Sequence, residues 1–213
     1  MPANSTAIVF GKGPVAVHAA DTLLRLGFDI LTVVPSSSEL SGQPSLRDWG
    51  REHERPVALT SDLDALDVSA DLGLSVYFDR LFRPRHIERF GRLLNVHNSL
   101  LPRHRGVRPI NWALLEGDRV HGVTLHEITP GVDDGPIVDQ EAFPISPEDE
   151  EVADVYTRCL DAATRLLDRS LPSIMTLPSE PQDETLATSH HSRDDVSLGD
   201  RRFWRRGDVS FTA

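Results

Sequence analysis

The sequence contains one cysteine, one lysine and no apolar run long enough to cross a membrane. With Cys159 alone, the chain can form no internal disulfide and no cluster of cysteine metal ligands. Its apolar runs fall far short of the ~20 residues that a membrane span requires, and its first residues lack the basic region of a signal peptide. These absences predict a soluble, cytoplasmic protein with no membrane partner.

Basic charge is scarce as well. The formal net charge of the 213 residues is −11, and Lys12 is the only lysine. A protein that grips a phosphate backbone needs clustered lysine and arginine to displace counterions. We therefore expect no nucleic acid among the partners. The length suits one globular domain with a sizeable core.

Strands and helices are predicted to alternate through the first half of the chain. Residues 7–10 and 28–34 are apolar and β-branched, and residues 15–26 between them carry apolar side chains at helical spacing. This order predicts a parallel sheet. Further strands are expected at 56–59, 72–78 and 93–96, and short helices at 45–54 and 84–90. The predicted fold class is α/β, with a doubly wound and mostly parallel sheet.

The turn after the first predicted strand contains Gly11, Lys12 and Gly13. Together with Ala16 it matches the G-x-G-x-x-A pattern of dinucleotide-binding turns. The second strand, however, is followed by a proline and serines rather than by the acid that would hold ribose hydroxyls. A dinucleotide site is therefore disfavoured. The turn is expected either to bind a phosphate or another anion or to be a plain tight turn.

A long helix and a polar tail complete the chain. Ser146 and Pro147 have the pattern of a helix start, and an apolar stripe follows from Val152 to Leu167. Cys159 lies on this stripe, so its thiol is expected to be buried and structural rather than a nucleophile. Residues 178–213 are polar and are expected to pack irregularly on the domain formed by residues 1–177. The tail's aromatic residues form either a homodimer contact or a packed flap: Phe203, Trp204 and Phe211.

Polar residues that could take part in catalysis are concentrated in residues 93–137. Asn95 and His97 are two residues apart in a predicted strand, so they project from the same face at its carboxyl end, where open α/β sheets bind ligands. An amide and an imidazole can stabilise an oxyanion and transfer a proton. Asp133, which lies between two glycines, is the candidate for a third group. The alternative is that Asn95 and His97 are simply hydrogen-bonded polar groups that cap the end of a strand.

Two familiar kinds of site do not fit this stretch. It has no G-x-S-x-G turn, so a serine hydrolase is disfavoured. A zinc site is disfavoured because its histidines lack the HExxH spacing: His97, His104, His121 and His126.

The segment NVHNSLLPRHRGVRPINWALLEGDRVHGVTLHEITPGVDDGPIVDQ closely resembles the catalytic core of formyltransferases that use 10-formyltetrahydrofolate. Methionyl-tRNA and glycinamide ribonucleotide formyltransferases share this pattern with the N-formyltransferases of nucleotide-linked amino sugars. The resemblance implies a Rossmann-like formyltransferase fold, a catalytic domain over residues 1–177, 10-formyltetrahydrofolate as co-substrate and no metal. The family's Asn-x-His and Asp-x-Gly match Asn95, His97 and Asp133, which would be catalytic. Asp133 is preferred to Asp134 because the family places the acid two residues before the glycine.

The resemblance also implies where the substrates bind. The folate would lie near the end of the strand at 72–78 and near the acidic turn, against Phe78, Arg80, Leu81, Phe82, Thr129, Val132 and Asp133. The amine acceptor is expected at the first turn and at the loop after Pro102, against Gly11, Lys12, Gly13, Arg105 and Gly106.

The acceptor is expected to be a primary amine of a small molecule. Family members that act on tRNA carry an additional C-terminal β-barrel and a basic surface, whereas this chain is acidic and has only residues 178–213 after its last predicted helix. Glycinamide ribonucleotide enzymes usually have G-N-G-S-N where this chain has G-K-G-P-V. A nucleotide-linked amino sugar is the first choice, and an amine from antibiotic or siderophore biosynthesis is the second. Three alternatives stay open: glycinamide ribonucleotide, hydrolysis as in formyltetrahydrofolate deformylase, and a non-catalytic folate-binding module.

Overall fold

The computed structural model describes residues 5–37, 42–148 and 150–188. The expectations for Phe203, Trp204 and Phe211, including the homodimer contact, lie outside the described residues. Among those described, no helix is both long enough and apolar enough to cross a membrane.

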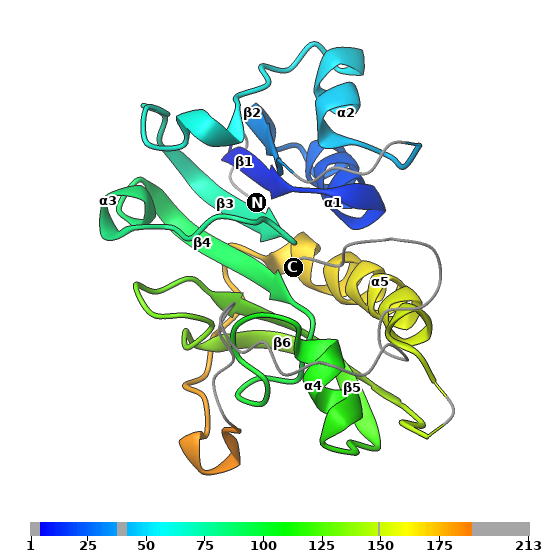
Figure 1. Cartoon of the computed structure of the whole chain (residues 1–213). Coiled ribbons are helices and arrows are strands. Elements are labelled where there is room, and N and C mark those ends of the chain that lie inside the picture. The colour runs from blue at the N-terminus through cyan, green and yellow to red at the C-terminus, as the bar shows by residue number, and fades with distance from the viewer. Residues whose placement is uncertain (1–4, 38–41, 149, 189–213) are drawn as a thin grey trace.

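A six-stranded sheet forms the centre of the molecule (Figure 1), in the order β2-β1-β3-β4-β5-β6. The first four strands are parallel: β1 (Thr6–Gly11), β2 (Asp29–Pro35), β3 (Ala70–Val76) and β4 (Phe90–His97). The last two extend the sheet in antiparallel fashion: β5 (Val120–Glu127) and β6 (Ile137–Pro144). The predicted α/β class with a mostly parallel, Rossmann-like sheet is confirmed.

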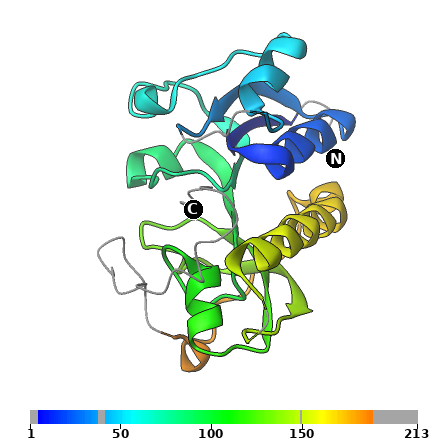
Figure 2. The same cartoon turned by 45° about the vertical axis from the view of Figure 1, so that its right-hand side comes forward.

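The two faces of the sheet are covered differently. Along β1, Ala7 and Val9 belong to the apolar cluster on one face, and Ile8 and Phe10 to the cluster on the other. Most helices pack on the first face, where Figure 2 shows α1 and α5 side by side: α1 (Gly13–Arg25), α2 (Leu46–Glu52), α4 (Pro109–Leu115) and α5 (Val152–Ser170). The second face is covered by short elements: α3 (Pro84–Ile87) and the 3₁₀ turn η1 (Thr60–Asp62). The 3₁₀ turns η2 (Leu171–Ser173) and η3 (Glu184–Leu186) follow α5.

Three predicted elements differ from the structure. Residues 56–59 form no strand, because Pro56 has no N–H to donate and Val57 makes only an isolated bridge with Val33. The helix predicted at 84–90 ends at Ile87. The last helix begins at Val152 rather than after Ser146, since the side chains of Glu151 and Asp154 cap its first turn reciprocally.

The strand β6 was not predicted. Its sequence IVDQEAFP contains acids that are uncommon in strands. They are tolerated at this edge because α5 supplies partners: Arg169 pairs with Asp139 and Glu141, and Ser170 donates to Asp139. The strand therefore depends on a helix that follows it in the chain.

Cys159 is fully buried in α5, as predicted. Burial raises the pKa of its thiol far above the usual range. A neutral thiol in this position is a packing group, not a nucleophile.

Candidate active site

A row of hydrogen bonds across three strands fixes the amide of Asn95. Asn95 on β4 lies opposite Ser75 on β3 and His126 on β5. The Ser75 hydroxyl donates to Asn95 Oδ1 (2.8 Å), and Asn95 Nδ2 lies 3.2 Å from His126 Nε2. His126 Nδ1 donates to the carbonyl of Glu127 (2.8 Å), so Nε2 carries no proton and accepts from the amide. The orientation of the Asn95 amide follows from this network.

His126 acts in this row as a neutral ring. Burial lowers its pKa to about 4, and the negative charge of Asp133 offsets this effect only in part. Its Nε2 lies 3.6 Å from Asp133 Oδ1, but a nitrogen that accepts from Asn95 forms no ion pair there.

His97 is held between a carbonyl and a carboxylate. Its Nε2 donates to the backbone carbonyl of His104 (3.1 Å), and its Nδ1 lies 3.5 Å from Asp133 Oδ2. The same carboxylate oxygen accepts from the backbone N–H of Gly106 (2.9 Å). His97 is 8% exposed, and the side chain of Asp133 is 16% exposed. Burial strengthens the electrostatic coupling between these groups.

The turn that carries Asp133 is shaped by close packing. Asp133 itself has a positive φ of 51°, a conformation that an aspartate adopts more readily than most residues. A Cβ on Gly135 would lie 1.9 Å from the carbonyl oxygen of Glu127. The glycine is therefore required by this close approach, whereas the left-handed conformation falls on Asp133. Asp134 points elsewhere and accepts from Thr129, so the structure brings Asp133 to His97.

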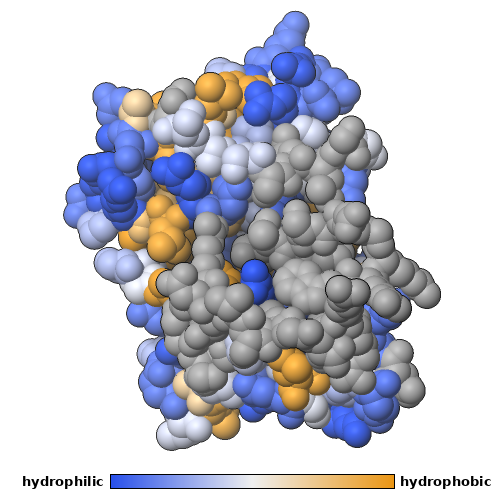
Figure 3. Space-filling model, in the orientation of Figure 1, coloured by the Kyte–Doolittle hydropathy of each residue, from blue (hydrophilic) through white to orange (hydrophobic). Residues whose placement is uncertain are grey.

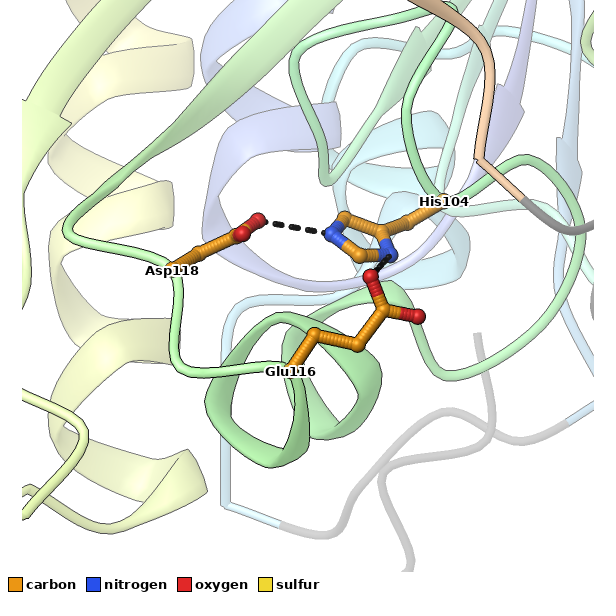
Figure 4. Close-up of side chains that lie close together, drawn as sticks. All are labelled: His104, Glu116 and Asp118. Carbon is orange, nitrogen blue, oxygen red and sulfur yellow. Dashed lines mark hydrogen bonds and ion pairs between the residues drawn. The ribbon is translucent and has the colours of Figure 1, made fainter.

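The loop that supplies the carbonyl of His104 has its own anchors. Figure 4 shows the His104 ring between two carboxylates, with Nε2 2.8 Å from Asp118 and Nδ1 4.0 Å from Glu116. Arg103 shares Asp118 at 2.5 Å. The two carboxylates face opposite ring nitrogens, and the Arg103 guanidinium also lies 3.9 Å from Glu116. Arg103 thus pairs with both carboxylates, and these ion pairs hold the loop in place.

Asn95, His97, His126 and Asp133 line one cavity of about 800 Å³, which is within the size range of small-molecule sites. Its walls are partly apolar, from Phe78, Leu81, Phe82, Ile128 and Val132. Figure 3 shows apolar surface in the corresponding region, between α3 and the turn before β6. Leu81, one of the lining residues, is 73% exposed.

The sequence-predicted residues divide into two groups at this cavity. All of those expected around the folate line it: Phe78, Arg80, Leu81, Phe82, Thr129, Val132 and Asp133. Of those expected around the acceptor, only Gly106 does so.

The turn of Gly11, Lys12 and Gly13 lies outside the described lining of the cavity. A Cβ on Gly11 would lie 1.9 Å from the carbonyl oxygen of Val76, so this glycine serves the close approach of β1 and β3. Burial lowers the pKa of Lys12, and the charge of Asp79 counteracts it. Asp79, whose charge acts on Lys12, lines the cavity.

Arg105 points away from the cavity into a pairing with the chain beyond α5. Its guanidinium donates to Gln182 Oε1 (2.6 and 3.0 Å) and to Glu184 (2.7 and 3.1 Å). Its side chain is 14% exposed.

Sequence reasoning did not assign roles to Ser75, His126 or Gln182. The first two could have been found from strand register, because they flank Asn95 across the sheet. This requires knowing that β5 runs antiparallel to β4. No local signal marks Gln182.

Comparisons with known proteins bear on the fold and the family of this chain. Residues 17–171 match the family model described as "Formyl transferase". The methionyl-tRNA formyltransferase of Deinococcus radiodurans is 40% identical over 197 residues, which cover 85% of this chain and 61% of that protein. The chain thus spans less than two thirds of this relative's length.

Two solved structures have the same fold. An N-formyltransferase from Helicobacter canadensis, in complex with folinic acid and dTDP-3-aminofucose, is 26% identical with a TM-score of 0.79, and the match covers 92% of this chain and 73% of that one. WlaRD, a sugar 3N-formyl transferase solved with dTDP and 5-N-formyl-THF, is also 26% identical with a TM-score of 0.79, over 93% of this chain and 73% of that one.

Proposed function

Since this chain belongs to the formyl transferase family, we propose that it transfers the formyl group of 10-formyltetrahydrofolate to a primary amine of a nucleotide-linked amino sugar. The observation that carries the proposal is the meeting of Asn95, His97 and Asp133 in the lining of a partly apolar cavity. An amide, an imidazole and a carboxylate are the groups that acyl transfer to an amine requires.

Each of the three groups has a role that follows from its contacts. The acceptor amine attacks the formyl carbon, forming a C–N bond and an oxyanion. The Asn95 amide, oriented by Ser75 and His126, donates a hydrogen bond to that oxyanion. His97 in its charged form stabilises the oxyanion electrostatically while its Nε2–H stays bonded to the carbonyl of His104.

Asp133 handles the proton. Its Oδ2 faces His97 Nδ1 at 3.5 Å, which places it to stabilise a charged imidazole. It takes a proton from the attacking amine, directly or through water. The proton is then delivered to N10 of the folate as the bond between N10 and the formyl carbon breaks, which releases tetrahydrofolate.

The cavity fits a folate in size and character. Phe78, Leu81 and Phe82 offer an apolar surface to a flat ring, and Arg80 on the same loop offers a cation to an acidic tail. Thr129 and Val132 complete the proposed folate contacts. We propose Gly106, together with Lys12 and its neighbouring glycines, for the acceptor.

Two observations support an amino sugar as the acceptor. Two solved relatives are described as enzymes of this kind or as bound to such a substrate. The net charge of −11 is unfavourable for gripping tRNA. A reaction between two such metabolites would take place in the cytoplasm.

Methionyl-tRNA is the second candidate acceptor, because a methionyl-tRNA formyltransferase is 40% identical to this chain. The test is an assay of tetrahydrofolate release from 10-formyltetrahydrofolate with dTDP- and UDP-linked amino sugars, glycinamide ribonucleotide, methionyl-tRNA or no amine. We expect release that depends on an amino sugar, with a formylated product detected by mass spectrometry. Release without any amine would indicate a hydrolase, and no release with any amine would indicate a binding module.

A further inference from the structure

The chain beyond α5 returns to the candidate active site. Glu180 pairs with Ile137 through two backbone hydrogen bonds, of 2.7 and 2.8 Å, beside the start of β6. This pairing places Gln182 next to the turn of Asp133. We propose that Gln182 is a positioning residue for formyl transfer, which holds Asp133 against His97. The inference rests on the proposed function.

The amide of Gln182 links the two loops that meet at Asp133. Its Nε2 donates to the carbonyl of Asp133 (2.8 Å) and to that of Gly135 (2.7 Å). Its Oε1 accepts from Nε and Nη2 of Arg105 (3.0 and 2.6 Å). Carbonyls only accept and a guanidinium only donates, so the amide has one orientation that satisfies all four contacts.

These contacts bear directly on the carboxylate. Asp133 has a positive φ of 51°, a conformation that persists where the surroundings determine it. Gln182 binds the carbonyls of Asp133 and Gly135, which lie on either side of Asp134 in the chain. These two hydrogen bonds fix the backbone turn that begins at Asp133. Arg105 precedes Gly106, whose N–H binds Asp133 Oδ2. Gln182 thus fixes both the turn that carries the carboxylate and the loop that receives it.

The same segment contacts the loop of His97 at two further points. Glu184 accepts from Arg105, and Thr188 Oγ1 lies 2.8 Å from the backbone N–H of His104. His104 is the residue whose carbonyl accepts from His97. Residues 180–188 therefore contact the supports of both Asp133 and His97 without lining the described part of the cavity.

Two variants of the full chain separate positioning from simple anchoring. Gln182→Glu keeps an oxygen for Arg105 but cannot donate to the two carbonyls, and Gln182→Leu removes all four contacts. Thr185→Ala is the matched control, because its hydroxyl bonds to Asp183 within the same segment. The measurements are kcat and both KM values well below the thermal midpoint, and hydrogen exchange of the backbone amides of residues 131–135.

We expect kcat to fall about 10- to 100-fold in both Gln182 variants, because small displacements of catalytic groups have effects of this size. Each KM should change by less than about threefold, since the interaction lost is one that matters in the transition state. Exchange at residues 131–135 should accelerate, while Thr185→Ala should match the wild type.

The proposal is overturned if both variants keep kcat within about twofold of the wild type, or if the loss of kcat only follows a loss of folded protein. Unchanged exchange at residues 131–135 would overturn it as well. A wild type without amine-dependent transfer would refute the proposed function instead, and the exchange measurement would still decide whether Gln182 holds the turn.

Discussion

Two regions of this protein carry polar residues at the carboxyl ends of parallel strands, yet they are built for different purposes. The turn of Gly11, Lys12 and Gly13 follows β1, and the groups around Asn95 and His97 end β4. In the first region, Gly11 is required because a Cβ there would collide with the carbonyl oxygen of Val76. Lys12 lies outside the described lining of the cavity. At the second, side chains from three strands and two loops converge.

The difference lies in what the neighbouring strands contribute. Asn95 has Ser75 on one side and His126 on the other, so its amide is oriented before any ligand binds. Gly11 is flanked by Pro35 and Val76, which offer no polar side chain. A polar turn at a strand end becomes a reaction site where the adjacent strands supply its partners.

The largest loss of activity is expected from a change at His97. His97→Ala should lower kcat about 10²- to 10⁴-fold, because it removes both the charge next to the oxyanion and the partner of Asp133. Steady-state formyl transfer checks this, with His18→Ala as control, since His18 pairs with Asp168 away from the cavity. Activity of His97→Ala near that of the wild type would show that the second region is not catalytic.

Substitutions along the row of hydrogen bonds that orients Asn95 should lower kcat to different extents. Asn95→Ala should lower kcat about 10²- to 10³-fold, the usual cost of losing a donor to an oxyanion. Ser75→Ala, which leaves the donor but frees its orientation, should cost about tenfold. Equal effects of the two changes on kcat would argue against this division of roles.

Acid should destabilise the fold through His121, a buried histidine of β5. Burial lowers the pKa of His121 to about 3, against an ordinary value of 6.5. Below pH 6.5 the unfolded chain therefore binds a proton that the folded chain does not, so stability falls as the pH decreases from 6.5 towards 3. At pH 5 the contribution is about 2 kcal/mol.

His121→Gln is the variant that isolates this effect, because glutamine does not titrate. The free energy of unfolding, measured by denaturant titration at pH 7 and pH 5, should decrease less for His121→Gln than for the wild type. An identical decrease would mean that His121 is not the group responsible.

The smallest effect is expected at the first turn. Lys12→Met should raise the KM for the amine acceptor by no more than a few-fold and leave kcat unchanged, since Lys12 lies outside the described lining of the cavity that holds the catalytic groups. A loss of kcat comparable to that of Asn95→Ala would show that the two regions form one site.

Much of this organisation could be predicted from the sequence because it is local. The two-residue spacing of Asn95 and His97 places both side chains on one face of the strand. The Asp-x-Gly pattern of the family, with its acid two residues before the glycine, singles out Asp133. Burial of Cys159 follows from the apolar stripe of its helix. The parallel sheet follows from the order of strands and helices.

The parts that escaped prediction depend on contacts between distant residues. The strand β6 is stabilised by arginines of the later helix α5. His126 enters the site through the register of an antiparallel pair, and Gln182 through a bond to a residue 49 positions earlier. Arg105 was expected to bind the amine acceptor; in the structure its guanidinium donates to Gln182 and Glu184. Neither spacing nor composition carries such information.

The most direct test of the account compares the two adjacent acids of the turn in a single-turnover assay with 10-formyltetrahydrofolate and the amine acceptor. Asp133 faces His97, whereas Asp134 is exposed and bonded to Thr129. Asp133→Asn should slow formyl transfer at least about 10²-fold. Asp134→Asn should transfer at close to the wild-type rate. Equal rates in the two variants, or a slower Asp134→Asn, would contradict the assignment of this cavity as the site of formyl transfer.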